Sequence, residues 1–430
     1  MTAMMNEEMK FNIPTNLSTE DRDALVEETM YNLNHHVNPA LVKWRKSGDH
    51  RAIEWTGRDY LLIDIAGNEY IDCLGGYGVF NFGHLHPHIV AAVKLQLDRM
   101  GISSQELLNP LMGRLARLLS QITPGDLQFT FFCNSGAEAS EASIKFAMLS
   151  SGKRGIIVMN MGYHGKTMGA LSATFRDVYR KPFEPLLPGF KPVPFNNIDA
   201  LAGAVDDTIG AVMMEPVQGE GGIIVPDNDY LPKVRQLCDD KGLKLIFDEV
   251  QSGMGRTGKN WACENWGVAP DILGTAKALG GGIVPMGACI ATPEVWKFLE
   301  PNPFIHSNTF GGNPLCCSAA IAAIEVLVKE NLADKAADTG KYFKGEFEKV
   351  MADYPTLVMA VRGIGLMIGV EMHERDKAVA AAQELFNRGV LTAHTMNNPK
   401  VIRIEPPLTI PKSACDEVIK RFRSILDGLM

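Results

Sequence analysis

The sequence lacks a hydrophobic run long enough to cross a membrane. Its longest strongly apolar stretch, residues 317–328, has 12 residues and includes Glu325, whereas a transmembrane helix needs about 20 apolar residues. The first residues, MTAMMNEEMKFN, carry acidic side chains and no apolar core of the kind that secretory signals have. We therefore expect a cytoplasmic protein with no membrane among its partners.

Basic patches and cysteine pairs are missing as well. The 42 Lys and Arg residues against 50 Asp and Glu residues give a net charge of −8, and no basic run resembles a nucleic-acid-binding patch. The 8 cysteines are scattered without a CxxC pair. This distribution favours buried thiols in a reducing compartment over a disulfide framework or a zinc site. We expect no nucleic acid among the partners.

Three motifs that often mark ligand sites are incomplete. His84, His86 and His88 alternate, but Pro87 interrupts them and the sequence places no carboxylate near them, so we expect no metal. Residues 253–258 read GxGxxG, yet they follow the preceding apolar run only after DEVQS and precede no helical apolar stripe. Residues 165–167 resemble the end of a P-loop, but Asn160 stands where its first glycine belongs.

The composition, with 46% hydrophobic and 21% charged residues, is that of a globular protein of roughly two to three lobes. The early chain predicts an amphipathic helix over 18–37, a β-hairpin over 58–74 and a helix over 86–100. Next, helical stretches alternate with apolar runs at 127–133, 154–160, 208–216, 243–250 and 287–292. This alternation predicts a parallel sheet covered by helices on both faces. Helical and strand-like segments beyond residue 315 predict a smaller α+β lobe.

Two of the predicted strands are followed by groups that suit a phosphate and a charged ring. The run 127–133 leads through Asn134 and Ser135 into a helix whose N-terminus would favour an anion, although an ordinary capped turn also fits. Asp248 ends the apolar run LKLIFD, at the edge where parallel sheets place ligands. A capping role on the next loop is the alternative for this carboxylate.

Two further segments carry an amine and an aromatic ring. Lys277 stands among small and apolar residues before three glycines, surroundings that lower the pKa of a lysine and make it a nucleophile, unless it is a surface lysine. Tyr163 follows the run 154–160 and could stack on a planar ring or fill the core. Together, a phosphate cradle, a stacking aromatic, a carboxylate and an imine-forming lysine are the parts that pyridoxal 5′-phosphate requires.

Longer strings then indicate a family. The sequence resembles the class III (subgroup II, ω-type) aminotransferases of pyridoxal-phosphate fold type I over nearly its whole length, through FGHLHP, NSGAEASEASIK, GYHGKT, EPVQGEGG, LIFDEVQSGMGRTG, PDILGTAKALGGG, TFGGNP, RGIGLM and IRIEPPL. The resemblance implies an α/β fold: a large cofactor-binding domain, residues 76–318, with a mostly parallel seven-stranded sheet between helices. Residues 1–75, an N-terminal segment, and 319–430 would contribute the smaller α+β domain.

The resemblance also assigns roles. Lys277 and Asp248 become the catalytic pair: the lysine forms a Schiff base with the cofactor and shuttles the proton, and the aspartate holds the pyridine nitrogen. The other cofactor-binding residues implied are Ser135, Gly136 and Ala137 at the phosphate, Tyr163 and His164 at the ring, Gln251 at the ring hydroxyl, and Thr309 reaching the phosphate of a neighbouring subunit. A homodimer with shared sites follows, and a tetramer stays open.

The substrate side of the expected site contains a charge pair. Arg403 matches the arginine that grips the α-carboxylate of glutamate or 2-oxoglutarate, and Glu220 matches the glutamate that pairs with it when the donor lacks that group. Tyr77 and Gln105 fall in segments that should line the substrate channel. Through SQELLNP, RKPFEPLLPGF and IRIEPPLT the sequence looks most like the diamine-using branch of the family.

The expected reaction moves the terminal amino group of putrescine or a similar diamine to 2-oxoglutarate, giving an amino-aldehyde and glutamate. Ornithine, acetylornithine, lysine or 4-aminobutyrate is the alternative donor. An aminomutase or decarboxylase on the same scaffold, and a binding protein without catalysis, are more distant alternatives.

Overall fold

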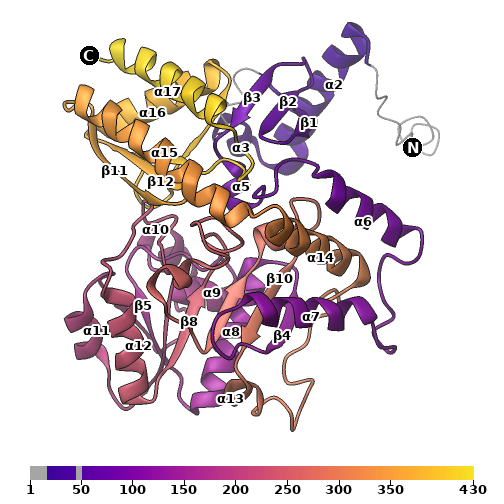
Figure 1. The fold of residues 1–430 in the computed structure, drawn as a ribbon, viewed down its shortest axis with the longest axis vertical. Coiled ribbons are helices and arrows are strands. Elements are labelled where there is room, and N and C mark those ends of the chain that lie inside the picture. Colours follow the sequence, from indigo (N-terminus) through magenta and orange to yellow (C-terminus); the bar gives the residue numbers. More distant parts are fainter. Residues whose placement is uncertain (1–16, 45–50) are drawn as a thin grey trace. The chain divides into compact units, whose positions relative to one another are not determined.

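The computed structural model describes residues 17–44 and 51–430 (Figure 1). The chain divides into two compact units, residues 1–56 with 62–69, and residues 57–61 with 70–430. Among the described residues, no helix is both long and apolar enough to cross a membrane. All 8 cysteines are buried free thiols, as their scattered positions predicted.

The first unit begins with a capped helix. Helix α2, Thr19–Asn32, starts after Ser18, whose side chain accepts the N–H of Asp21 while the Asp21 carboxylate accepts the N–H of Ser18. A π-helix, Leu33–Val37, and helix α3, Pro39–Trp44, follow. The predicted N-cap is therefore confirmed, but no residue of α2 is buried, so the expected apolar face is not found.

The predicted hairpin over residues 58–74 is present around a turn at Asp64. The strands of this region are β1 (Glu54–Arg58), β2 (Leu61–Asp64) and β3 (Glu69–Asp72). The N–H of Asp64 donates to the carbonyl of Asn68, and the Asp64 carboxylate accepts two backbone N–H groups of the same turn. At its end, β3 pairs in parallel with β13, Val390–Leu391, through Ile71 and Asp72.

A seven-stranded, mostly parallel sheet forms the centre of the second unit. Its order is β4-β10-β9-β8-β7-β5-β6, and only β10 runs antiparallel to its neighbours. The strands are β4 (Phe129–Cys133), β5 (Gly155–Met159), β6 (Phe190–Val193), β7 (Ile209–Met214), β8 (Lys244–Asp248), β9 (Ile272–Thr275) and β10 (Gly287–Ala291). The seven-stranded sheet of fold type I is confirmed.

Alternate side chains of these strands face two separate hydrophobic cores. On one face Ile156, Met213 and Ile246 pack with helix α8, Gly136–Ser151. On the other face Ile157, Val212 and Phe247 pack with helices α7 (Pro110–Ile122), α12 (Tyr230–Lys241) and α14 (Pro314–Lys329). Helices cover this sheet (Figure 1). Strands buried on both faces carry apolar residues at nearly every position, which is why the sequence shows continuous runs.

Shorter helices connect these elements. They are α5 (Gly75–Gly78), α6 (Pro87–Leu97), α9 (Met168–Ala173), α10 (Asp177–Arg180), α11 (Ile198–Ala204) and α13 (Pro293–Trp296), with single 3-10 turns at Lys181–Phe183, Ala262–Trp266 and Lys277–Gly280. The predicted helix over 86–100 is therefore α6.

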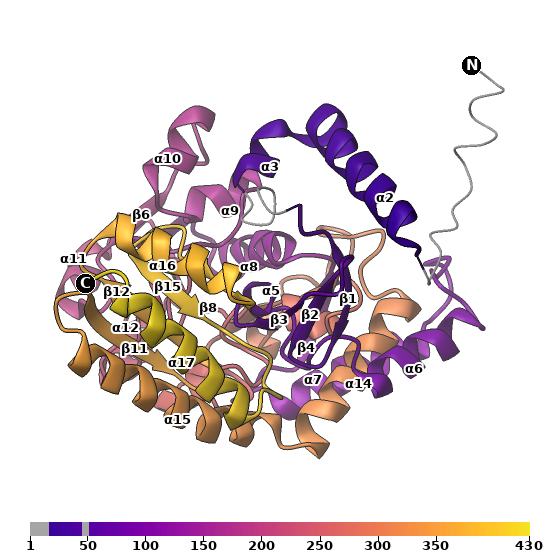
Figure 2. The same cartoon turned by 90° about the horizontal axis from the view of Figure 1, so that it is seen from above.

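The C-terminal residues of the second unit form a four-stranded sheet covered by helices. The strand order is β11-β12-β15-β14, with β11 (Val358–Ile364), β12 (Met367–Met372), β14 (Ala393–His394) and β15 (Val401–Ile404). Helices α15 (Leu332–Asp353), α16 (Arg375–Asn387) and α17 (Lys412–Asp427) lie beside one another on this sheet (Figure 2). The α+β character predicted beyond residue 315 is confirmed.

Two strands of the seven-stranded sheet are absent from the sequence-based prediction. Strand β6 is a half-exposed edge strand interrupted by Pro192, and β9 has only 4 residues, one of them Gly274. Both have only 4 residues, and each includes a residue that is unfavourable inside a strand, Pro192 or Gly274. The expected domain boundaries at 75/76 and 318/319 stay predictions, and the second of them falls inside α14.

Candidate active site

Five parallel strands deliver the candidate site residues to one edge of the large sheet. Strand β8 ends at Asp248, and the segments that follow β4, β5, β7 and β9 carry Ser135, His164, Glu215 and Lys277. The carboxyl ends of parallel strands meet at one edge, and this edge is where open α/β sheets bind ligands.

A buried histidine contacts Asp248. His164 Nδ1 lies 2.7 Å from Asp248 Oδ2, with the two side chains 0% and 7% exposed. Asp248 Oδ1 accepts the N–H of Val250 at 3.0 Å. Burial acts to lower the pKa of His164, but the hydrogen bond and charge of Asp248, with the charge of Glu215, raise that pKa above its ordinary value. The aspartate is thus held in a fixed orientation beside a ring whose pKa it raises.

Glu215 is a second buried carboxylate at this edge. Its Oε1 accepts the N–H of Tyr163 at 3.0 Å and its Oε2 accepts the N–H of Gly219 at 2.9 Å. Burial, with a smaller contribution from the charge of Asp248, raises the pKa of Glu215 to about 7. This side chain therefore ties the loop that carries Tyr163 to the loop that carries Glu220.

The N-terminus of α8 lies at the end of β4. Ser135 caps the helix, its hydroxyl oxygen accepting the N–H of Glu138 at 3.2 Å. The N–H groups of Gly136 and Ala137, at the first two helical positions, have no acceptor within the helix. A Cβ on Gly136 would lie 2.8 Å from Val250 Cγ1, so a larger residue here would force the turn or the Val250 side chain to shift. The result is a pair of N–H groups without an acceptor in the helix, at the positive end of a 16-residue helix.

Lys277 follows β9 and adopts a left-handed backbone conformation with φ +49°. Burial lowers the pKa of its ammonium, while the charges of Glu220, Glu405 and Asp248 act to raise it and that of Arg403 acts to lower it. A lysine in such surroundings is neutral more often than a surface lysine and can act as a nucleophile or base.

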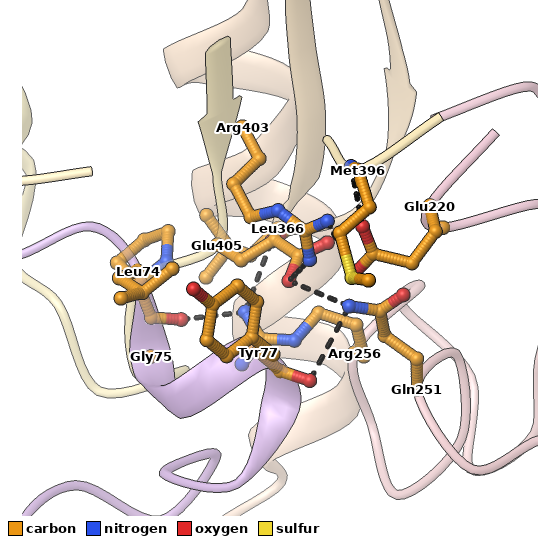
Figure 3. Close-up of polar contacts among 12 residues, drawn as sticks. Leu74, Gly75, Tyr77, Glu220, Gln251, Arg256, Leu366, Met396, Arg403 and Glu405 are labelled. Atoms are coloured by element: carbon orange, nitrogen blue, oxygen red, sulfur yellow. Dashed lines mark hydrogen bonds and ion pairs between the residues drawn. The ribbon is translucent and has the colours of Figure 1, made fainter. Parts of the chain in front are cut away.

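Arg403, on β15, forms the centre of a second cluster (Figure 3). It is 0% exposed, and its Nη2 lies 2.6 Å from Glu220 Oε1. Glu220 is held in turn by the N–H of Met396, which donates to Oε2 at 2.7 Å. The expected pairing of Arg403 with Glu220 is present in the geometry, and it leaves a buried cation neutralised by a carboxylate on a loop.

Tyr77 and Gln251 connect the two clusters (Figure 3). The Tyr77 ring centroid lies 4.9 Å from the Arg403 guanidinium carbon, and the Tyr77 carbonyl accepts the Gln251 amide at 3.3 Å. The same amide donates to Glu405 Oε2 at 3.2 Å. Gln251, three residues after Asp248, therefore links the strand end of the large sheet to the arginine of the small sheet.

Two of the predicted residues lie outside these contacts. Thr309 and Gln105 are exposed. No hydrogen bond or ion pair joins either to the clusters within residues 17–44 and 51–430. For Thr309 this exposure agrees with a role towards a second subunit, which stays a prediction.

The expectation that no carboxylate lies near the alternating histidines is wrong. His84 Nε2 lies 2.8 Å from Asp72, His86 Nε2 lies 3.1 Å from Glu330, and His88 Nε2 lies 2.9 Å from Glu325. These carboxylates are brought in by the tertiary fold from β3 and the end of α14, so the local sequence could not show them. In the described part of the chain no group of His, Cys, Asp and Glu side chains is arranged to hold a metal.

Comparisons with known proteins agree with this geometry. The model of the class-III aminotransferase family matches residues 47–426. The chain belongs to the class-III aminotransferases. It is 48% identical to the putrescine aminotransferase of Pectobacterium atrosepticum, covering 96% of this chain and 91% of that one. The ornithine aminotransferase of Toxoplasma gondii, crystallised with partial occupancy of pyridoxal phosphate, has a TM-score of 0.85 at 29% identity, covering 99% and 97% of the two chains.

A further structural neighbour fixes the cofactor class. The amine transaminase of an uncultivated Pseudomonas species, solved in its pyridoxal-phosphate-bound form, has a TM-score of 0.81 at 27% identity, covering 88% of this chain and 95% of that one. Class membership and these neighbours indicate pyridoxal phosphate as the cofactor of this aminotransferase. The chain's own residues fit it, since the α8 N-terminus suits a phosphate and the buried Asp248 suits a cationic ring nitrogen.

Sequence reasoning missed two buried residues of this aminotransferase site. Glu215 directly follows β7, so the strand-end argument applied to Asp248 could have found it. Glu405 stands in the string IRIEPPL, but nothing local shows that its side chain meets both Arg403 and Gln251. That contact depends on how the two sheets approach each other.

Proposed function

We propose that the protein transfers the terminal amino group of putrescine or a similar diamine to 2-oxoglutarate, giving an amino-aldehyde and glutamate. The ion pair of 2.6 Å between Arg403 and Glu220 carries this proposal. With Glu220 in place, the arginine is neutralised and a donor without an α-carboxylate can occupy the pocket. If Glu220 moves away, the guanidinium fork is available to the α-carboxylate of a keto acid. The 48% identity to a putrescine aminotransferase supports the choice of donor.

The cofactor contacts proposed here follow the family resemblance and the local chemistry. Ser135, Gly136 and Ala137 would hold the phosphate at the α8 N-terminus, with Thr309 of a second subunit. Asp248 would hold the ring nitrogen, Gln251 the ring hydroxyl, and Tyr163 with His164 the face of the ring. When bound, pyridoxal phosphate supplies an aldehyde that takes up the amino group and a ring that withdraws electrons from the reacting carbon.

Lys277 and Asp248 carry the proposed catalytic roles. Burial lowers the pKa of the Lys277 ammonium, so its Nζ is a free amine more often than that of a surface lysine and can accept a proton from the substrate carbon and return it. Asp248 keeps a negative charge at a fixed position because His164 and the N–H of Val250 hold both of its oxygens. The chain must therefore supply two groups: an amine that moves the proton, Lys277, and a carboxylate held in a fixed position, Asp248.

We also propose a homodimer with shared sites. The segment 101–109 and the segment 310–315 lie side by side, joined by the Leu315 N–H to the Gly101 carbonyl at 3.1 Å. Both segments and their flanks expose large apolar side chains, among them Ile102, Leu107, Leu108, Phe304 and Phe310. A patch of this kind next to Thr309 is typical of an interface. Replacing Leu108 by Asp should yield monomers, which light scattering would detect by their mass. The activity of these monomers should be weaker than that of the dimer. A cytoplasmic location and a tetramer formed by two dimers remain part of the same proposal.

A panel of donors tests the function. The holoenzyme is mixed with putrescine, cadaverine, ornithine, acetylornithine, lysine or 4-aminobutyrate, and the change in cofactor absorption gives kcat/KM for each half-reaction. Putrescine or a near homologue should have the highest value. A much higher value for ornithine would transfer the assignment to an ornithine aminotransferase, an alternative that the Toxoplasma neighbour favours. Turnover without any keto acid would indicate an aminomutase or a decarboxylase.

A further inference from the structure

Glu405 is a buried carboxylate beside Arg403 that no role described above accounts for. It follows β15 directly and is 0% exposed. Its backbone is fixed, because its N–H donates to the Cys73 carbonyl at 2.8 Å and Pro406 and Pro407 follow it. Carboxylates are rarely fully buried, since removing a charge from water is costly unless partners replace the water.

The partners of Glu405 use only one of its oxygens. Oε2 lies 3.5 Å from Arg403 Nη1 and accepts the Gln251 amide at 3.2 Å (Figure 3). Oε1 is buried and has no hydrogen-bond partner among the described residues. A buried, unsatisfied carboxylate oxygen is expensive, and such groups are often explained by a ligand. The guanidinium of Arg403 thus lies between two carboxylates, Glu220 at Nη2 and Glu405 at Nη1.

The two carboxylates differ in their freedom. Glu220 belongs to the loop after β7, where its carbonyl accepts the N–H of Asn397 at 2.9 Å, and its carboxylate contacts Arg403 and the N–H of Met396. Glu405 is held at its backbone and at two side-chain contacts, so it stays when Glu220 moves. Any ligand that places an α-carboxylate on Arg403, the keto acid included, would therefore meet the charge of Glu405 on the same guanidinium.

The field of Glu405 also reaches the reacting amine. Its charge acts to raise the pKa of Lys277, as does that of Glu220, against the larger effect of burial. The neighbouring cation Arg256 feels the charge of Glu405, but its hydrogen bonds go to other groups, with Nη1 donating to the Leu366 carbonyl at 2.9 Å and Nη2 to Asn81 at 2.6 Å. In the described part of the chain Arg256 forms no ion pair with Glu405.

The geometry points to Glu405 as a specificity-determining residue, whose fixed negative charge favours cationic amine donors over donors that carry an α-carboxylate. This inference rests on the proposed diamine donor. A diamine brings a second ammonium into the pocket. There Arg403 carries one positive charge against the two carboxylates Glu220 and Glu405, so one negative charge is left over. Attraction of that ammonium and repulsion of carboxylates are two consequences of the same charge, and like-charge repulsion is an effective means of rejecting wrong ligands.

The test uses E405Q, which keeps the shape and removes the charge, and E405D, which keeps the charge. In E405Q we expect kcat/KM for putrescine to fall at least about tenfold, the scale of a lost charged contact, while ornithine and 4-aminobutyrate are unchanged or improved. Glutarate, a dicarboxylate that does not react, should bind the E405Q holoenzyme more tightly in calorimetry. E405D should keep the preference for putrescine. Glu417→Gln, on the surface of α17, serves as the control.

Several outcomes would overturn this role. If E405Q lowers kcat/KM for putrescine and the affinity for carboxylate ligands by the same factor, Glu405 only supports Arg403 and Gln251, and its role is structural. Failure of both E405Q and E405D to fold would likewise show a structural role. The proposed function is tested separately by the wild-type enzyme: a preference of the wild type for ornithine defeats the diamine assignment, whereas an unchanged ratio in E405Q with a putrescine-preferring wild type defeats only this inference.

Discussion

His164 Nδ1 and Asp248 Oδ2 meet at 2.7 Å at the carboxyl edge of the large sheet, with both side chains almost fully buried. The contact joins the loop after β5 to the end of β8, two segments 84 residues apart. It gives the aspartate a fixed orientation and leaves its charge next to a ring whose pKa is raised. The proposed role of Asp248 depends on this support.

Replacing His164 by Gln should therefore weaken cofactor binding and catalysis together. Loss of a charged hydrogen bond to a buried carboxylate costs about 1.5–3 kcal/mol, which corresponds to roughly a tenfold to hundredfold effect. Absorption titration of the apoprotein with pyridoxal phosphate measures the loss of cofactor affinity, and kcat of the holoenzyme measures the loss of catalysis. His373→Gln, an exposed histidine on the small sheet, should change neither. Unaltered affinity in H164Q would remove the positioning role.

Replacing Arg403 by Lys should selectively impair the keto-acid half-reaction. A lysine keeps the charge but cannot form the two parallel hydrogen bonds of a guanidinium fork. We expect kcat/KM for 2-oxoglutarate to fall roughly thirtyfold, which corresponds to about 2 kcal/mol of lost transition-state stabilisation. The kcat/KM for putrescine should fall by a smaller factor. Arg423→Lys, at an exposed pair with Asp353, is the matched control. Equal losses for both substrates would contradict the proposed role.

Glu215 should make stability depend on pH. Its pKa is about 7 in the folded protein, against an ordinary value of 4.5 that applies when the chain is unfolded. Between these values the folded state binds more protons, so the free energy of unfolding falls as pH rises from 4.5 to 7, by at most about 1.4 kcal/mol per pH unit from this group. In the apoprotein, Glu215→Gln should flatten this slope, measured by chemical denaturation at several pH values. An identical slope in both proteins would show that Glu215 titrates normally.

Two glycine substitutions should affect different properties, one weakening cofactor binding and the other raising stability. Gly136→Ala places a Cβ 2.8 Å from Val250 Cγ1 at the α8 N-terminus, so the turn must shift and phosphate affinity should fall. Gly113→Ala, at an exposed position of helix α7 with no atom within 4 Å of the added Cβ, should raise the free energy of unfolding by about 0.5–1 kcal/mol. Absorption titration with pyridoxal phosphate measures the affinity of G136A for the cofactor, and chemical denaturation measures the free energy of unfolding of G113A. Tight cofactor binding by G136A would exclude this turn as the phosphate cradle.

The sequence predicted the elements whose patterns are local. Continuous apolar runs identified β5, β7 and β8 because both faces of those strands are buried. Ser18 was predicted as a cap because capping involves residues three positions apart. Strand β9 was missed, although Lys277 follows it, because its 4 residues carry too little pattern.

Contacts between distant segments could not be predicted in this way. His84 meets Asp72, and Glu405 meets Arg403 and Gln251, only after β3 and β15 are placed against the large sheet. Arg403 and Glu220 lie far apart in the sequence, and their pairing was expected only through the family resemblance. Side-chain pairs of this kind are products of tertiary packing, so a single sequence contains no local signal for them.

The central claim is that Lys277 holds the cofactor. Reduction of the holoenzyme with borohydride, followed by proteolysis and mass spectrometry, locates the lysine that carries the cofactor. We predict a pyridoxyl-phosphate label on Lys277, loss of the label in Lys277→Ala and no turnover in that variant. A label on another lysine, or full turnover in Lys277→Ala, would contradict this claim.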